Sequence, residues 1–170
     1  MRRKRQKARN LPNGDLGDAL ATMISFQNYV QHADGKAGVL VVSHAGAAAM
    51  VAAQTGAVAR LEGAGLAAGL ALLSLFLLGF LVSGYHILQV IRPVLRPPTL
   101  RSRYGITGVD ATAMPTTEDV TTNLAEAWAM ARLLAKIAQR KYRHVSRALP
   151  WAGLMFVSAI SWTVLLAAWR

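Results

Sequence analysis

The sequence predicts an all-α integral membrane protein with three transmembrane helices, a hairpin plus a C-terminal span, and cytosolic helical extensions that pack together. Three apolar runs predict this fold: residues 37–59, 64–91 and 149–169. Each can cross a hydrocarbon core about 30 Å thick, which takes about 20 helical residues. The chain has 170 residues, 54% of them hydrophobic. The segments outside the runs are shorter than an ordinary catalytic domain, so we expect no enzyme.

The distribution of charge predicts the orientation in the membrane. The formal net charge is +11, and all but two of the 19 Lys and Arg residues precede the first run or lie between the second and third. The exceptions are Arg60 and Arg170. Since cytoplasmic segments carry the excess of Lys and Arg, we expect the N-terminus and the long loop in the cytoplasm and the C-terminus outside.

The expected organisation is a disordered basic N-terminus followed by a single membrane domain. The disordered segment is residues 1–14, where Leu-Pro-Asn-Gly is typical of a turn. Asp15 is a plausible N-cap for the helix that follows. The elements of the domain, in order, are a cytosolic helix 15–36, a first span 37–59, a second span 64–91, a cytosolic loop and helix 92–148, and a third span 149–169.

The first two spans are expected to form a tight hairpin. Leu20, Met23 and Val30 share one face of the preceding helix, which either runs straight into the first span or bends at Gly35. Small residues dominate the first span, and the second carries Gly65-x-x-x-Gly69. Such residues let helices approach closely in lipid, where packing drives association. The small residues of the first span with a spacing of four are Ala45, Ala49 and Ala53.

After a loop over residues 101–115, Thr116 is expected to begin a long amphipathic helix, with Asp119 completing a variant capping box. This helix leads into the third span, with or without an interruption at Pro150. We expect its apolar face to pack against residues 16–35. One face carries Val120, Leu124, Ala127, Ala131, Leu134, Ala138, Tyr142, Val145 and Leu149. The nearly opposite face carries Arg132, Lys136, Arg140, Arg143 and Arg147.

Motifs for catalysis, metals and cofactors are missing from the sequence. It has no cysteine, no Gly-rich phosphate loop, no nucleophile elbow and no His pair at metal-ligand spacing. The histidines are scattered along the chain, at His32, His44, His86 and His144. His44 falls within the first span, where we expect a neutral imidazole that is hydrogen-bonded to a neighbouring helix. We therefore expect no catalytic residue, metal or cofactor.

Two charged clusters are expected at the same depth, just inside the membrane. Asp34 and Lys36 end the first cytosolic helix, and Lys141 and Tyr142 lie near the base of the last one. We expect an ion pair between Asp34 and Lys141 across the two helices; the alternative is two unrelated interfacial charges. The basic face over residues 132–147 is either a solvated or lipid-facing flank, or a surface for an anionic ligand such as a nucleotide phosphate. Nucleic acid is not expected, because no aromatic residues interleave with the cations.

The pattern at these residues resembles the membrane effector domain of the bacterial Pycsar antiphage systems. The motifs are Ala33-Asp34-Gly35-Lys36-Ala37 before the hairpin and Lys141-Tyr142-Arg143 before the last span, and the resemblance covers about residues 16–169. It implies that a partner cyclase makes cyclic CMP or cyclic UMP on infection, and that the effector responds by damaging the inner membrane. It also implies that Asp34, Lys36, Lys141 and Tyr142 form a core with either a ligand-binding or a structural role.

Two functions follow as hypotheses. The first is a nucleotide-gated effector that contacts the lipid bilayer, binds cyclic CMP or cyclic UMP, and acts as a homo-oligomer. No span carries a polar stripe to line a wide channel, so assembly that disrupts the membrane is favoured over a preformed pore. The second is a constitutive membrane scaffold or plasmid-transfer protein, with a basic cytosolic face that binds a partner and ignores small nucleotides.

Overall fold

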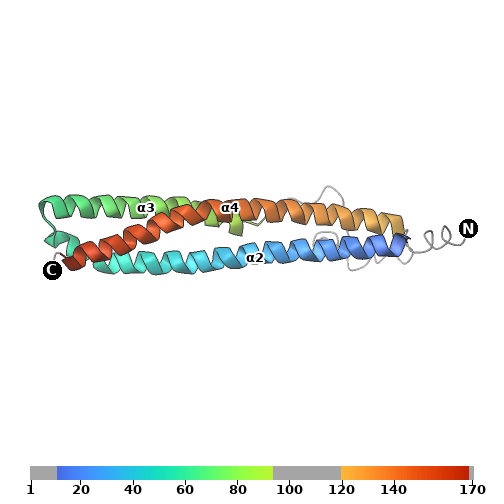
Figure 1. Ribbon diagram of the computed structural model, residues 1–170, viewed down its shortest axis with the longest axis horizontal. Helices are drawn as coiled ribbons and strands as arrows, with labels where there is room; N and C mark the ends of the chain where they lie inside the picture. The colour runs from blue at the N-terminus through green and yellow to red at the C-terminus, as the bar shows by residue number, and fades with distance from the viewer. Residues whose placement is uncertain (1–10, 94–119, 169–170) are drawn as a thin grey trace, which may run out of the picture. The chain divides into compact units, whose positions relative to one another are not determined.

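The computed structural model describes residues 11–93 and 120–168, with side chains from residue 15 in the first range and from residue 121 in the second. Its elements are α2 (Leu11–Gln54), the 3₁₀ helix η1 (Thr55–Arg60), α3 (Gly63–Ile91) and α4 (Val120–Ala168) (Figure 1). No strand occurs in these ranges. Each of the three long helices is apolar and long enough to cross a membrane, so the predicted fold class is confirmed.

Some sequence expectations fall outside the described residues. These are the disorder of residues 1–10, the loop over residues 101–115, and the helix start at Thr116 with its capping box at Asp119. α4 is described from Val120 onward, which agrees with a long helix leading into the third apolar run.

Both ends of the first long helix differ from the prediction. α2 begins at Leu11, so Asp15 lies inside the helix and does not cap it. The reason is that Pro12 falls in the first turn, where a helix tolerates proline because that N–H needs no partner. At the other end the α-helix stops at Gln54, and residues 55–59 of the expected first span form η1 together with Arg60. Helices often tighten into 3₁₀ turns at the C-terminus, and Gly56 weakens the α-helix there.

The helix is continuous in the structure at both positions where the sequence allowed a bend or an interruption. α2 passes through Gly35 and α4 passes through Pro150 without a break in the helix. Proline removes one helical hydrogen bond, and helices in lipid tolerate this where neighbouring helices hold the backbone in place. The turn between η1 and α3 depends on a glycine: Gly63 has φ +52, a conformation that side chains with a Cβ disfavour.

The chain divides into two compact units, which we describe separately. The described part of the first unit consists of residues 11–32 of α2 and 120–139 of α4, together with Pro93. Its most buried side chains are Ala19, Ala127 and Ala131, each at most 1% exposed. Alanines at an interface let two helices approach closely. The two helical extensions thus belong to one compact unit, in agreement with the packing expected for them.

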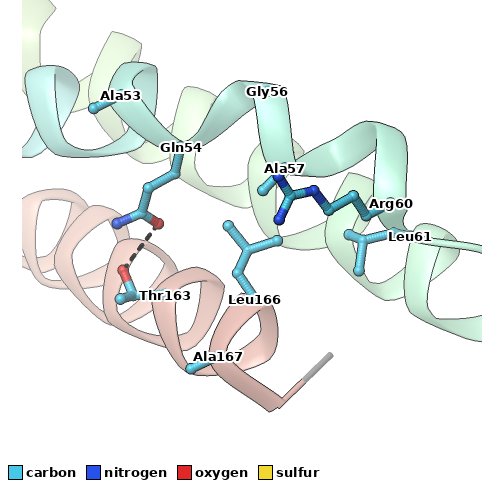
Figure 2. Close-up of a pocket in the computed structure, with 9 residues that line it drawn as sticks. All are labelled: Ala53, Gln54, Gly56, Ala57, Arg60, Leu61, Thr163, Leu166 and Ala167. Atoms are coloured by element: carbon cyan, nitrogen blue, oxygen red, sulfur yellow. Dashed lines mark hydrogen bonds between the residues drawn. The ribbon is translucent and has the colours of Figure 1, made fainter. Parts of the chain in front are cut away.

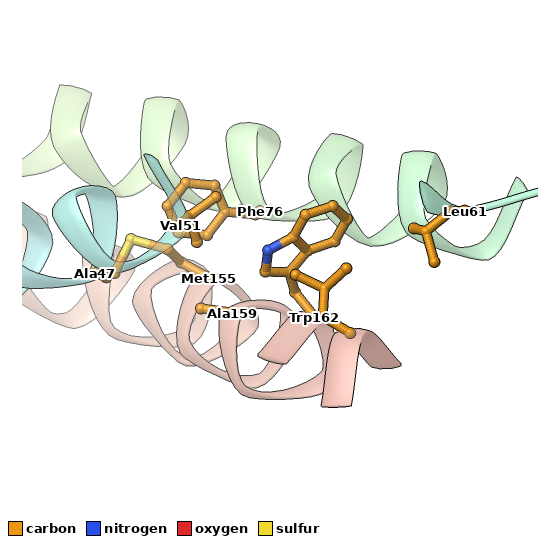
Figure 3. Packing of buried hydrophobic residues seen from close by; sticks show 8 residues of the cluster. Ala47, Val51, Leu61, Phe76, Met155, Ala159 and Trp162 are labelled. Carbon is orange, nitrogen blue, oxygen red and sulfur yellow. The ribbon is translucent and has the colours of Figure 1, made fainter. Parts of the chain in front are cut away.

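The second unit consists of residues 33–92 and 140–170, described as far as residue 168, and contains most of the apolar runs. Trp162 and Met155 are fully or almost fully buried at the centre of its larger core cluster (Figure 3). That cluster joins α2, η1, α3 and α4, so residues from both sides of the hairpin pack on the last helix. Its remaining members are Ala47, Val51, Leu61, Phe76, Ala159 and Leu166.

Glycines of α3 set how closely it approaches α4. A Cβ on Gly79 would lie 2.8 Å from the Trp151 carbonyl oxygen and 2.9 Å from the Met155 nitrogen, so backbone packs on backbone there. A Cβ on Gly69 would meet Leu61 and Trp162 side chains at 3.0 and 3.2 Å. Gly69 of the Gly65-x-x-x-Gly69 motif thus supports close packing, but against Leu61 and α4 and not against the first span as expected. Gly79 is a contact that the motif did not predict.

Much of the apolar surface of the three long helices stays exposed in the isolated chain. Val42 is 73% exposed, Leu88 67% and Val157 63%. In water such a surface would be costly, whereas lipid solvates it at no cost. Leu149 belongs to this surface, being 54% exposed, so its expected place on the buried face of the last helix is wrong. It follows Ala148, which is buried, and the buried face there continues through Ala152 and Met155.

Candidate functional site

Two contacts join α2 to α4 at the start of the second unit. The Lys141 ammonium donates a hydrogen bond to Asp34 Oδ1, which makes the expected ion pair. The Lys36 ammonium lies 5.3 Å from the ring centroid of Tyr142, within the range of a cation–π interaction. Asp34, Lys36, Lys141 and Tyr142, which we call the junction cluster, are therefore brought together as the sequence predicted.

Burial differs across the ion pair. The Lys141 side chain is 13% exposed and that of Asp34 45%. A mostly buried ammonium needs an anion, because desolvation penalises an unpaired charge, and Asp34 supplies one from the solvent side. Lys36 remains exposed apart from the Tyr142 ring. The cluster can thus present a cation and an aromatic face to an incoming anion while Lys141 is neutralised.

Small and branched apolar residues hold the junction cluster in place. Ala33 and Ala37 flank Asp34 and Lys36 on α2 and are fully buried. Ala37 belongs to the smaller core cluster of the second unit, whose other buried members are Ile87, Val90, Val145 and Ala148. This core cluster contains residues of α2, α3 and α4. A change in the junction cluster would therefore alter the packing of all three helices.

Two histidines meet beside the junction cluster, although they are far apart in sequence. The Nδ1 atoms of His86 on α3 and His144 on α4 lie 3.2 Å apart. Such a pair is joined by one N–H that donates to the other ring, so both rings cannot be charged without repulsion. Burial lowers the pKa of His144, and the nearby His86, Arg140, Arg147 and Arg143 lower this pKa further.

We expect the folded protein to lose stability as the pH falls from 8 to 5.5, in part because of His144. A free histidine titrates near 6.5, and the folded state holds the pKa of His144 below that value. The unfolded chain therefore binds the proton first, and the stabilisation is present above about pH 6.5 and is lost as the pH falls through the folded pKa. Thermal unfolding in detergent, followed by circular dichroism, measures this. His144→Gln should flatten the pH dependence; an unchanged pH dependence would contradict the assignment.

The basic residues of the last helix are all exposed side chains on α4. Arg132 and Lys136 lie in the first unit, whereas Arg140, Arg143 and Arg147 lie in the second. Arg140 and Arg143 lie directly on either side of Lys141 and Tyr142 in the sequence, and Arg147 lies one helical turn further on. Its guanidinium groups have no ion-pair partner among the described residues, so they add positive charge near His144 and Tyr142.

His44 forms the polar contact that the sequence predicted for it. His44 Nδ1 lies 2.7 Å from the Leu40 carbonyl oxygen, to which it can only donate, and Nε2 lies 2.5 Å from Ser83 Oγ on α3. A neutral ring then accepts the Ser83 hydroxyl proton, for which the Gly79 carbonyl oxygen 2.5 Å away is the competing acceptor. His44 is 6% exposed and Ser83 is fully buried, so this pair joins α2 to α3 inside the apolar region.

The residues that sequence reasoning missed are those whose partners lie on another helix. Ser83 and Gly79 look like ordinary small residues of an apolar run, and nothing in the sequence pairs His86 with His144. Among the described residues, no group of three or more His, Cys, Asp or Glu side chains could hold a metal ion. The site is thus built from an ion pair, a cation–π contact and a histidine pair.

Comparison with known protein families gives one match over nearly the whole chain. The model of the Pycsar effector protein domain matches residues 18–169, which include the junction cluster, all of α3 and α4, and α2 except its first seven residues. Comparison with curated proteins and with solved structures gives no match.

Proposed function

Because the chain belongs to the Pycsar effector domain family, we propose that it responds to a cyclic pyrimidine nucleotide by impairing the inner membrane. The family places it among the effectors of antiphage defence, and its three apolar helices make it a membrane protein. The observation that carries the proposal is the match over residues 18–169, which includes both the junction cluster and the apolar helices. Sensing and membrane action thus reside in one domain, without a catalytic step.

The junction cluster offers the chemistry that a cyclic pyrimidine nucleotide requires. Such a ligand carries one negative charge on its phosphodiester, together with a flat base. Lys36 can donate to the phosphate, and the Tyr142 ring can stack on the base in place of the Lys36 ammonium. The loop and helix over residues 92–148, with the N-terminus, would face the cytoplasm, where the nucleotide is made.

The Asp34–Lys141 ion pair can be either formed or broken, which gives the contact between α2 and α4 two arrangements. The ligand phosphate competes with the Asp34 carboxylate for Lys141, so binding is coupled to the contact between α2 and α4. A ligand shifts such an equilibrium only as far as it binds one arrangement better. Separation at the junction would expose more of α2, where Ala45, Ala49 and Ala53 are already open to contact by a second copy. Assembly of copies then disturbs the bilayer.

Membrane potential in living cells tests the proposal. We expect a potential-sensitive dye to report depolarisation when the full chain is expressed with a cyclase that makes cyclic CMP or cyclic UMP, and none with an adenylate cyclase. Lys36→Gln should shift the response to higher nucleotide levels by about fivefold, the effect of one cation on a phosphate-sized charge. Arg92→Gln, an exposed cation at the C-terminal end of α3, is the matched control and should respond as wild type.

The second candidate function is favoured by the exposed basic residues of α4, which suit an acidic partner protein. A constitutive scaffold or plasmid-transfer protein would use this face and ignore small nucleotides. An unchanged membrane potential at saturating cyclic CMP and cyclic UMP, with the protein present in the membrane, would contradict the effector proposal and leave this reading in its place.

A further inference from the structure

A pocket opens where the first apolar run ends, far along the chain from the junction cluster. It has a volume of about 440 Å³, within the range of small-molecule sites, and lies between the end of α2, η1 and the last turns of α4 (Figure 2). Methyl groups and leucine side chains form about half of its wall, and polar groups form the rest. The apolar lining residues are Ala53, Gly56, Ala57, Leu61, Leu166 and Ala167, and the polar ones are Gln54, Arg60 and Thr163.

The polar residues of the pocket differ in whether their donors have acceptors. Figure 2 shows the Arg60 side chain extending back along η1 toward Ala57, and its guanidinium has no partner among the described residues. The Thr163 hydroxyl bonds the Ala159 carbonyl oxygen at 3.0 Å and reaches Gln54 Oε1 only at 3.4 Å. The Gln54 amide nitrogen has no described acceptor either, but Figure 2 shows it pointing away from the Arg60 guanidinium, which is thus the donor that remains for a ligand.

The charge around the pocket selects for an anion. No acidic side chain occurs among the described residues that line it. A ligand with a positive group would therefore find no counter-charge in the lining, whereas a phosphate would find Arg60. Arg60 is also one of the two cations that depart from the charge asymmetry of the sequence, as it lies between the first two apolar runs.

The depth of the pocket matches the headgroup level of a bilayer. α3 begins at Gly63, immediately after η1 and Leu61. At about 1.5 Å per residue it covers a hydrocarbon core of about 30 Å before it reaches Tyr85. Tyrosine is typical of a membrane–water interface, so Tyr85 marks one boundary and Arg60 the other. A ligand at this depth presents a phosphate toward Arg60 and apolar chains toward the alanine wall.

We propose that this pocket binds the phosphodiester headgroup of an anionic phospholipid. Arg60 pairs with the phosphate, and the start of an acyl chain covers Ala53 and Ala57. A bound lipid would fill the space between η1 and the end of α4. The inference is independent of the nucleotide response, because it involves no residue of the junction cluster.

Binding of defined lipids to the purified full chain in detergent tests this site. Phosphatidylglycerol is expected to remain bound in native mass spectrometry and to raise the unfolding temperature. Arg60→Gln should weaken the apparent affinity about fivefold, the effect of one cation at a membrane surface. Ala53→Leu should weaken binding by filling the wall without changing the charge. Arg92→Gln removes a cation at the other end of α3 and should bind phosphatidylglycerol as wild type.

Each other outcome overturns a part of the proposal. Equal retention of phosphatidylglycerol by Arg60→Gln and wild type would remove the pocket as the site. Equal affinity for phosphatidylcholine would overturn the preference for a net anionic headgroup. An equal stabilisation by glycerol phosphate or inorganic phosphate would assign the pocket to a soluble phosphate and not to a lipid. The membrane-potential assay is scored separately, so a failure here leaves the effector proposal as it stands.

Discussion

Gly79→Val is expected to prevent α3 from packing on α4 and to leave little folded protein in detergent. Even the first added carbon would lie 2.8 Å from the Trp151 carbonyl oxygen and 2.9 Å from the Met155 nitrogen, and both are backbone atoms that no rotamer change can move. Overpacking of a well-packed core typically costs about 1–3 kcal/mol, and valine in contact with backbone should reach at least the upper end. Size-exclusion chromatography and thermal unfolding by circular dichroism measure the effect.

The same helix supplies the control for this substitution. A Cβ on Gly84 would meet nothing within 4 Å, so Gly84→Ala should unfold at or slightly above the wild-type temperature, since alanine favours the helix. Gly79→Ala should fall between Gly84→Ala and Gly79→Val. A Gly79→Val protein that is monodisperse and as stable as Gly84→Ala would show that α3 and α4 do not approach as closely as described.

Reversing the charge of Asp34 is expected to destabilise the protein by about 2 kcal/mol and to abolish the depolarisation response. Asp34→Lys leaves the Lys141 ammonium, which is 13% exposed, without an anion and adds a third cation beside Lys36. Loss of one partner of a fully buried pair costs about 3–5 kcal/mol, and the 45% exposure of Asp34 reduces that figure through solvent screening. Lys141→Asp should behave alike, and the double reversal should recover most of the stability and of the response.

An exposed carboxylate on the same helix serves as the comparison. Asp18 is exposed and has no partner among the described residues, so Asp18→Lys changes the net charge by the same amount without breaking a contact. Its free energy of unfolding should lie within about 0.5 kcal/mol of the wild-type value, as is usual for surface substitutions. If the double reversal is no better than either single reversal, the two charges do not act as a pair, and the junction cluster loses its proposed role as a two-state element.

How far the sequence predicts the structure depends on whether a feature is set along one helix or between helices. The apolar runs predicted α3 to within one residue, because a long apolar run is specified by its own composition. The Asp34–Lys141 pair was also predictable, since both residues occur at the membrane end of an amphipathic helix and two opposite charges at one depth attract. The end of the first run was not predictable from hydropathy, because a 3₁₀ turn and an α-helix bury the same residue types.

Contacts that depend on the rotation of one helix against another could not be predicted from the sequence. The His86–His144 pair and the His44–Ser83 bond require α3 to turn particular faces toward α4 and α2. In an apolar run without polar periodicity, every face looks alike. Gly79 illustrates the point: the sequence contains several glycines in its apolar runs, and only the packing tells which one carries a backbone contact.

The alanine packing of the first unit has a thermodynamic consequence. Among the described residues of this unit, those buried to at least 99% are Ala19, Ala127 and Ala131. A methyl group removes little area from water, worth about 0.8 kcal/mol, whereas a buried tryptophan or methionine such as Trp162 or Met155 contributes several times more. Local opening of residues 11–32 and 120–139 therefore costs less than opening of the second unit. Backbone fluctuations should therefore be larger in the first unit than in the second.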